Sequence, residues 1–373
     1  MRFSIDKPQG EDNQSIGLLR RRSLDLGWLQ QTKAQAPLSA QQIADRWSSS
    51  QAIVLPQAVS GFLKPQKKHI TRTLQLMEQV LDEVDCEDVF TESPYQERLN
   101  GKFAMLGSIY DEGDRQEIEK IEFDALENGE IIAENLWVKL SWLSFDEDDS
   151  SFRLRFSFGL EQYEDVSQDL QREILTAQLA EAIFPESVAI SENQNLIEQC
   201  KNLLQSKSLE FVERIIYFNA PNGGAQFHHD VEKGHAGVVF SQLYGRTAWF
   251  ALSKQQLLSE VQFFRKNTAS AEMFSVLGKE KEFAEFKAST EDMKIFSDQM
   301  NEGGHDHVEV LLNQIPEFFQ QLADNGYAFI LEPGDVILLP QQDEENCVWH
   351  TVFCFDDFPG HALSFAMRAG VEG

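Results

Sequence analysis

Residues 223–253 read GGAQFHHDVEKGHAGVVFSQLYGRTAWFALS. Short apolar runs rich in β-branched and aromatic residues, separated by glycine, are typical of β-strands. The stretch therefore predicts strands at 225–231, 237–245 and 246–253. Gly223 and Gly224 stand before the first of them, where a turn can use their freedom to adopt positive φ angles.

His228 and Asp230 lie two residues apart in the first of these predicted strands. Side chains at that spacing project from the same face of a strand, and His229 then projects from the other face. A histidine and a carboxylate on one face can bind a metal ion together. The alternative is a structural hydrogen bond between the two side chains.

A third ligand is predicted at His350, in the late apolar segment VWHTVFCF at 348–355. Two histidines and one carboxylate form a facial triad, which leaves several coordination positions of the metal open for small molecules. The alternative for His350 is a histidine packed in the core beside Trp349.

The segments around this stretch extend the strand pattern in the C-terminal half. Strands are predicted at 211–220, 327–332, 336–340, 348–355 and 361–368, with a Pro-Gly-Asp turn at 333–335. The intervening stretch at about 254–325 is charged and helical in pattern, and reads as an insertion. Its last helix is predicted to begin at Pro316 and to end at Gly326.

The N-terminal half mixes both kinds of element. Helices are predicted at 40–47 (with Ser39 as N-cap), 69–84, 166–184 and 192–205, and a hairpin of strands at 136–145 and 152–158 with the acidic loop 146–149 between them. Residues 1 to about 35 are polar and are predicted to be loosely ordered. The expected fold class is α+β, mainly β. The expected division is an N-terminal α+β region at 1–185, packing on the barrel of a domain at 186–373.

Four motifs, in this order, resemble the JmjC and related cupin-like Fe(II)/2-oxoglutarate dioxygenases. They are His228-His229-Asp230, Gln242-Leu243-Tyr244-Gly245-Arg246, Pro333-Gly334-Asp335 and Trp349-His350, and Gly334 and Pro340 keep the spacing of the second cupin motif. The resemblance covers residues 211 to about 370. It implies a double-stranded β-helix (cupin or jelly-roll) barrel with flanking helices, in which His228, Asp230 and His350 are the catalytic metal ligands for Fe(II) and 2-oxoglutarate is the cosubstrate.

One position departs from the family pattern. The resemblance implies a lysine or arginine two residues after Gly245, to pair with the distal carboxylate of 2-oxoglutarate, but the residue there is Thr247. A hydroxyl donates a hydrogen bond but forms no ion pair. Arg368 on the last predicted strand is the first candidate for that cation and Arg246 the second, so the predicted cosubstrate-binding residues are Arg368, Arg246 and Thr247. The alternative for Arg368 is a purely structural role.

The charge of the chain limits its partners. The 32 Lys and Arg against 61 Asp and Glu give a formal net charge of −29, which would repel phosphate backbones and anionic membranes. Direct nucleic-acid binding and membrane binding are therefore not expected. The charge would attract a basic protein side chain as substrate. A small-molecule substrate is the equal alternative, and the acidity can also serve only to keep the protein soluble. Four cysteines without CxxC spacing, and no apolar leader, favour a cytoplasmic protein; a homodimer is left open.

Other histidines offer competing sites. His305-Asp306-His307 follows two glycines and precedes a helical stretch, which suits a loop or helix cap better than a metal site. His235 lies close after the main motif, and packing or exposure is expected there; His361 and Cys354 are interpreted as structural.

Three functions compete on this sequence. The first is 2-oxoglutarate-dependent hydroxylation of an unidentified substrate. The second is a cupin enzyme that binds iron, manganese or zinc without 2-oxoglutarate, which Thr247 favours. The third is a catalytically silent scaffold that binds a protein partner. The N-terminal half is expected to shape the substrate entrance or a dimer interface.

Overall fold

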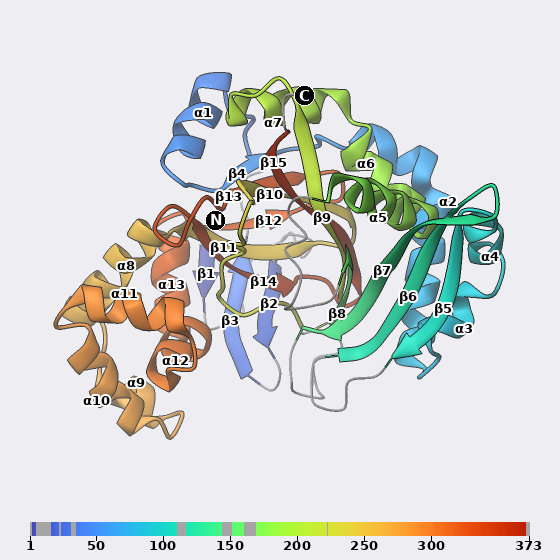
Figure 1. Cartoon of the computed structure of the whole chain (residues 1–373). Coiled ribbons are helices and arrows are strands. Elements are labelled where there is room, and N and C mark those ends of the chain that lie inside the picture. The colour runs from blue at the N-terminus through green and yellow to red at the C-terminus, as the bar shows by residue number, and fades with distance from the viewer. Residues whose placement is uncertain are drawn as a thin grey trace.

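The computed structural model describes residues 2–4, 16–21, 24–30, 35–109, 117–143, 151–159, 169–221 and 223–370. Within these ranges two antiparallel sheets face each other and helices cover their outer faces (Figure 1). The mainly β, α+β class expected from the sequence is confirmed. The sheets of the described chain position the site.

The large sheet has nine strands in the described part of the chain, and every neighbouring pair is antiparallel. In spatial order they are β4 (Ile53–Leu55), β13 (Val336–Pro340), β10 (Gly237–Tyr244), β15 (Gly360–Ala369), β9 (Leu209–Asn219), β8 (Phe152–Phe158), β7 (Glu130–Trp142), β6 (Glu117–Glu127) and β5 (Phe103–Ile109). The predicted hairpin is β7 with β8, and its joining loop lies outside the described residues.

The small sheet has the order β12 (Ala328–Leu331), β11 (Thr247–Ser253) and β14 (Val348–Cys354). A buried apolar cluster joins it to the large sheet, with Phe240 and Leu339 from one side and Trp249 and Val352 from the other. Strand side chains alternate between the two faces of a sheet, so half of each inner strand faces this shared interior. The interior between the two sheets is where the predicted ligands have to meet.

Helices cover the outer face of the large sheet. The helices of this part are α1 (Ala40–Ser48), α2 (Ser60–Leu81), α3 (Cys86–Phe90), α4 (Tyr95–Leu99), α5 (Leu170–Ile183), the 3₁₀ turn η3 (Pro185–Ser187), α6 (Val188–Ser191) and α7 (Gln194–Leu204). Phe152, Leu154 and Phe156 of β8 belong to the apolar cluster on this side. Because β8 alternates, Arg153 and Arg155 are left to the opposite, inner face.

Six helices of the described chain cover the outer face of the small sheet and gather at one end of the molecule, at the lower left of Figure 1. They are α8 (Lys254–Asn267), α9 (Ala271–Ser275), α10 (Glu280–Ser289), α11 (Met293–Glu302), α12 (Asp306–Gln314) and α13 (Pro316–Asp324). Their phenylalanines pack with Phe250 and Phe353 of the small sheet. The prediction of a helical stretch at 254–325 is confirmed, and so are the helices at α1, α5 and α7; α2 begins earlier than predicted.

The prediction that residues 1 to about 35 are loosely ordered is wrong for the part that the structure describes. There β1 (Arg2–Ser4), β2 (Ile16–Arg21) and β3 (Leu24–Gln30) form an antiparallel sheet in the order β1-β3-β2. Leu19, Leu26 and Leu29 are buried in the cluster around α8–α13. These three leucines gain their burial from distant helices and from the small sheet, which local polarity does not reveal.

No helix of the described chain is long and apolar enough to cross a membrane. The predicted division at residue 185 stays a prediction.

Candidate metal site

A short backbone ladder brings His228 beside His350. The segment from Gly223 runs antiparallel to β14, with hydrogen bonds from Cys354 N to Gly223 O (2.9 Å), from Ala225 N to Val352 O (3.1 Å) and from Val352 N to Ala225 O (3.0 Å). The ladder ends at a bridge in which His228 and His350 exchange both amide hydrogen bonds, at 3.0 and 2.9 Å. Two residues so paired have neighbouring side chains on one face.

The prediction of a full strand at 225–231 is therefore only partly right. His228 forms an isolated bridge, and no strand continues through Asp230. After the bridge the chain leaves β14 and reaches β15, where Ala236 N donates to Met367 O. Asp230 is thus positioned by this change of direction rather than by the alternation of a strand.

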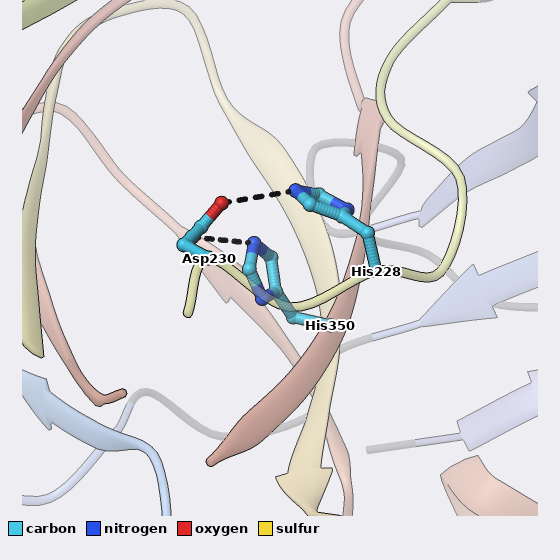
Figure 2. Close-up of side chains that lie close together, drawn as sticks. All are labelled: His228, Asp230 and His350. Carbon is cyan, nitrogen blue, oxygen red and sulfur yellow. Dashed lines mark ion pairs between the residues drawn. The ribbon is translucent and has the colours of Figure 1, made fainter. Parts of the chain in front are cut away.

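The three predicted ligands nevertheless meet at one point (Figure 2). His228 Nε2 lies 3.4 Å from Asp230 Oδ1 and His350 Nε2 lies 3.5 Å from Asp230 Oδ2. Charge-assisted hydrogen bonds are shorter, about 2.7–2.9 Å. Ligands bound about 2.1 Å from one metal at right angles stand about 3 Å apart. The spacing fits a metal between the three groups better than a tight His–Asp hydrogen bond.

The charge states of His350 and Asp230 suit a cation, whereas His228 has to lose a proton before it can bind one. Burial and the neighbouring His228 lower the pKa of His350 to about 3, so this imidazole is neutral. Burial favours the neutral form of Asp230, but the His350 and His228 rings hold the pKa of Asp230 well below its usual range. Burial disfavours the charged form of His228, yet Asp230 outweighs it and the pKa of His228 is raised. Neutral imidazole and ionised carboxylate are the forms that bind metals.

Access to the three ligands is uneven. The side chains of His228 and Asp230 are 38% and 30% exposed, whereas that of His350 is 4% exposed. The His350 ring stacks on Trp249 at 5.3 Å between centroids, and His229 packs edge-on against Trp349. One side of the site is thus held rigidly by the small sheet and the other side is open.

Thr247 binds the indole ring of Trp249, on which the His350 ring stacks. Trp249 Nε1 donates to Thr247 Oγ1 (2.8 Å), and Thr247 Oγ1 donates to Gln242 Oε1 (2.9 Å). Gln242 Nε2 in turn donates to Tyr244 O (2.7 Å). The Gln-Leu-Tyr-Gly-Arg motif and Thr247 therefore form one buried hydrogen-bond chain that orients Trp249.

Thr247→Val is expected to lower the free energy of unfolding by about 1–3 kcal/mol, because Trp249 Nε1 and Gln242 Oε1 lose their partner in a buried place of unchanged shape. Urea denaturation of the metal-free protein measures the change. Thr247→Ser keeps the hydroxyl and serves as the control; equal stability of the valine variant and the native chain would contradict this role.

The triad opens into a cavity between the two sheets. Its described lining consists of Leu143, Tyr217, Asn219, Ala225, His228, Asp230, Val238, Phe240, Trp249, Leu339, His350, Val352 and Ser364. The space amounts to about 380 Å³, counting the part that opens to solvent. Apolar walls with a few convergent polar groups are typical of small-molecule sites.

Arg368 and Arg246, the two predicted cosubstrate cations, do not belong to the described lining of this cavity. Arg368 forms ion pairs with Glu173 and Glu210, both at 2.8 Å. Arg246 donates two hydrogen bonds to the Asp356 carboxylate, from Nε at 2.8 Å and from Nη2 at 2.5 Å. Their part in binding a cosubstrate stays a prediction.

The competing histidines lie elsewhere in the described chain. His305 is the N-cap residue of α12, as its context predicted, and it pairs with Glu302 at 3.1 Å. His361 is buried against Glu186 at 3.2 Å. Within the described ranges, the groups close enough to share a metal are the triad and the set Glu213, Glu232 and His235.

That second set already holds a cation. Arg155 pairs with both glutamates, with Glu213 closely and with Glu232 at 3.2 Å. Burial raises the pKa of Glu213 to about 7. A guanidinium between the carboxylates explains the cluster without a metal.

Tyr217, Asn219 and Ser364 were not singled out by the sequence. They line the cavity because β9 and β15 present alternate residues to the interior, whereas Ile216 and Phe218 face the helices. Alternation along FVERIIYFN was visible in the sequence, but it could not say which face bounds a cavity.

Comparisons with known proteins give only distant likenesses. No family model and no curated protein matches the sequence. A solved structure of ycfD from Escherichia coli aligns with 90% of this chain and 54% of its own, at 12% identity and a TM-score of 0.29. Another, of the ribosomal oxygenase YcfD, aligns with 100% and 54%, at 10% identity and a TM-score of 0.24. A third, YcfD with cobalt and succinic acid, aligns with 69% and 41%, at 13% identity and a TM-score of 0.25.

The chain thus spans about half the length of these structures or less. TM-scores this low do not establish a shared fold, so the function has to be argued from the residues of the site.

Proposed function

We propose that this chain is an Fe(II)- and 2-oxoglutarate-dependent oxygenase that hydroxylates a C–H bond. The observation that carries the proposal is the meeting of His228, Asp230 and His350 at a cavity between two sheets. The proposal includes a double-stranded β-helix barrel made of the two facing sheets. It also keeps the division of the chain near residue 185.

The three side chains would hold the metal through two imidazole nitrogens and one carboxylate oxygen, on one side only. With iron bound, the chemistry supplied is the coupling of substrate hydroxylation to oxidation of 2-oxoglutarate, in which one atom of O₂ enters the product and the other enters succinate, with release of CO₂. Asp230 stays ionised and His350 neutral at neutral pH, so neither has to lose a proton before binding.

The rest of the cavity has two tasks. Trp249 and Val352 exclude water from one side of the triad, and Trp249 also holds the His350 ring in place. Phe240 and Leu339 continue this apolar wall on the large sheet. A dry wall protects an oxidising site from side reactions, and a fixed ligand keeps the open positions in constant geometry.

The substrate we propose is a basic protein side chain. The support is the formal net charge of −29, which attracts a cationic partner and accelerates its encounter with the protein. His228 and Asp230 are the more exposed ligands, so the substrate would approach from their side.

The test uses purified, metal-free protein under anaerobic conditions. Ferrous ion is added first and 2-oxoglutarate is titrated next, while the visible spectrum is recorded. A charge-transfer band that needs both additions is expected, and His228→Ala is expected to abolish it. His305→Ala, which removes a partly exposed histidine outside the cavity, is the matched control.

Two other outcomes would each replace the proposal. Iron binding without any effect of 2-oxoglutarate would favour a cupin enzyme with another cosubstrate. Failure of the native chain to bind ferrous, manganous or zinc ions would leave the scaffold that binds a protein partner.

A further inference from the structure

The position that normally provides the cation for 2-oxoglutarate has another task here. Thr247 is 0% exposed, and its hydroxyl is used by Trp249 and Gln242. The distal carboxylate of a cosubstrate therefore needs a partner from another strand, because a carboxylate buried without a cation is costly.

The register of the large sheet places one arginine beside a residue that lines the cavity, although Arg153 itself does not belong to the described lining. Arg153 of β8 stands directly opposite Tyr217 of β9. Paired residues share a face of the sheet, and Tyr217 lines the cavity with the three candidate ligands. Asn219 follows Tyr217 by two residues and lines the same cavity. Arg153, Tyr217 and Asn219 thus share the inner face.

The other arginines of β8, β9 and β15 pair with glutamates, Arg155 on the inner face and Arg214 and Arg368 on the face that α5 covers. Arg155 pairs with Glu213, Arg214 with Glu181 and Arg368 with Glu173. For Arg153, no ion pair with a carboxylate occurs among the residues that the structure describes. Its Nε is buried and has no hydrogen-bond partner in the described chain.

A second donor at this wall also lacks a partner. Asn219 is 3% exposed, and its Nδ2 has no hydrogen-bond acceptor among the described residues. Buried donors are nearly always satisfied, so an orphaned one in a cavity wall points to a ligand. An amide N–H and a guanidinium on the same face of two neighbouring strands present donors to one anion.

Arg153 also influences the charge states of residues that line the cavity. Burial raises the pKa of Tyr217 to about 12, and Arg153 is the largest influence that opposes the increase. Arg153 also favours the ionised form of Asp230 and disfavours the charged form of His228. Its charge therefore reaches both the polar wall and the triad.

We propose that Arg153 on β8, assisted by Asn219 and Tyr217 on β9, binds the distal carboxylate of the cosubstrate, in place of the cation that Thr247 does not provide. The inference rests on the proposed function and names the acid that the site accepts. It is a 2-oxo acid with a second carboxylate, because an arginine without an acidic partner would select for that charge.

The experiment compares the binding of two acids by the native protein and by variants of Arg153 and Arg368. Ferrous ion and then either 2-oxoglutarate or 2-oxobutanoate, which lacks the distal carboxylate, are titrated anaerobically into native protein, Arg153→Met and Arg368→Met. Arg153→Met is expected to weaken 2-oxoglutarate binding by at least roughly tenfold, since one partner of a charge pair is lost. Its affinity for ferrous ion and for 2-oxobutanoate is expected to stay within about twofold of native.

Unchanged binding of 2-oxobutanoate shows that the variant still has a folded site, and Arg153→Lys, which keeps the charge, is expected to recover part of the loss. Equal affinity of native protein and Arg153→Met for 2-oxoglutarate would overturn the inference and leave the proposed function standing. A tenfold loss in Arg368→Met instead would assign the role to that residue. If the native protein binds ferrous ion but neither acid, the proposed function and the inference both fail.

Discussion

Asp230→Asn is expected to lower the affinity of the chain for divalent metal by at least about a hundredfold. The substitution keeps the shape of the side chain but removes the only negative charge of the triad, so two neutral imidazoles remain. Loss of a group that merely supports a ligand already costs about 10- to 100-fold in metal affinity, and loss of a ligand costs more. Cobalt(II), which absorbs visible light when bound, is a convenient probe for calorimetric and spectroscopic titration.

The control for this substitution is Asp298→Asn, an exposed position on α11. Its cobalt affinity is expected to equal that of the native chain, and the far-UV spectra of all three proteins are expected to coincide. The Asp230 carboxylate lies 3.4 Å from His228 Nε2 and 3.5 Å from His350 Nε2. Because Asp230 raises the pKa of His228, Asp230→Asn is also expected to lower that pKa. Metal affinity of Asp230→Asn within threefold of native would exclude the triad.

Gly224→Ala is expected to lower the free energy of unfolding by at least about 2 kcal/mol and to weaken metal binding at the same time. Gly224 has a φ of 142°, and a Cβ there would lie 2.1 Å from Val352 O, on the backbone of β14. The ladder that places His228 beside His350 begins at this point. The chain has to move away from β14, and His228 moves with it.

Gly278→Ala separates the cost of alanine at a positive φ angle from the cost of the clash with the β14 backbone. Gly278 also has a positive φ, of 67°, but a Cβ there would have no neighbour within 4 Å. The free energy of unfolding of this variant is expected to fall by only about 1 kcal/mol, the conformational cost of alanine at this position. It is expected to bind cobalt as the native chain does. Urea denaturation and cobalt titration of both variants check the pair. If Gly224→Ala behaves like Gly278→Ala, the ladder does not position His228.

The sequence by itself determined most of the elements. Alternating apolar residues in FRLRFSF and the apolar runs around 237–253 and 336–368 predicted strands that the structure contains. The capping residue Ser39 predicted the start of α1, and its side chain accepts from Gln42 N. These features are local, because a strand pattern or a helix cap is set by residues a few positions apart.

The sequence also predicted the three ligands, but the assumption of a continuous strand through His228 and Asp230 was incorrect. His228 and Asp230 were paired by the alternation of a strand, but only a bridge at His228 exists and Asp230 follows a change of direction. The order of the motifs along the chain therefore predicted the three ligands better than the assumed strand geometry did.

Tertiary structure alone decided which charges are available at the cavity. Arg153, Arg155 and Arg368 look alike in the sequence, but Arg155 and Arg368 meet glutamates from other segments, whereas Arg153 stands opposite Tyr217, which lines the cavity. The hydrogen bonds of Thr247 with Trp249 and Gln242 likewise form only when the strands are packed together. The physical reason is that the alternation of a strand sets which residues share a face, while the register of neighbouring strands and the packing of two sheets determine what that face meets.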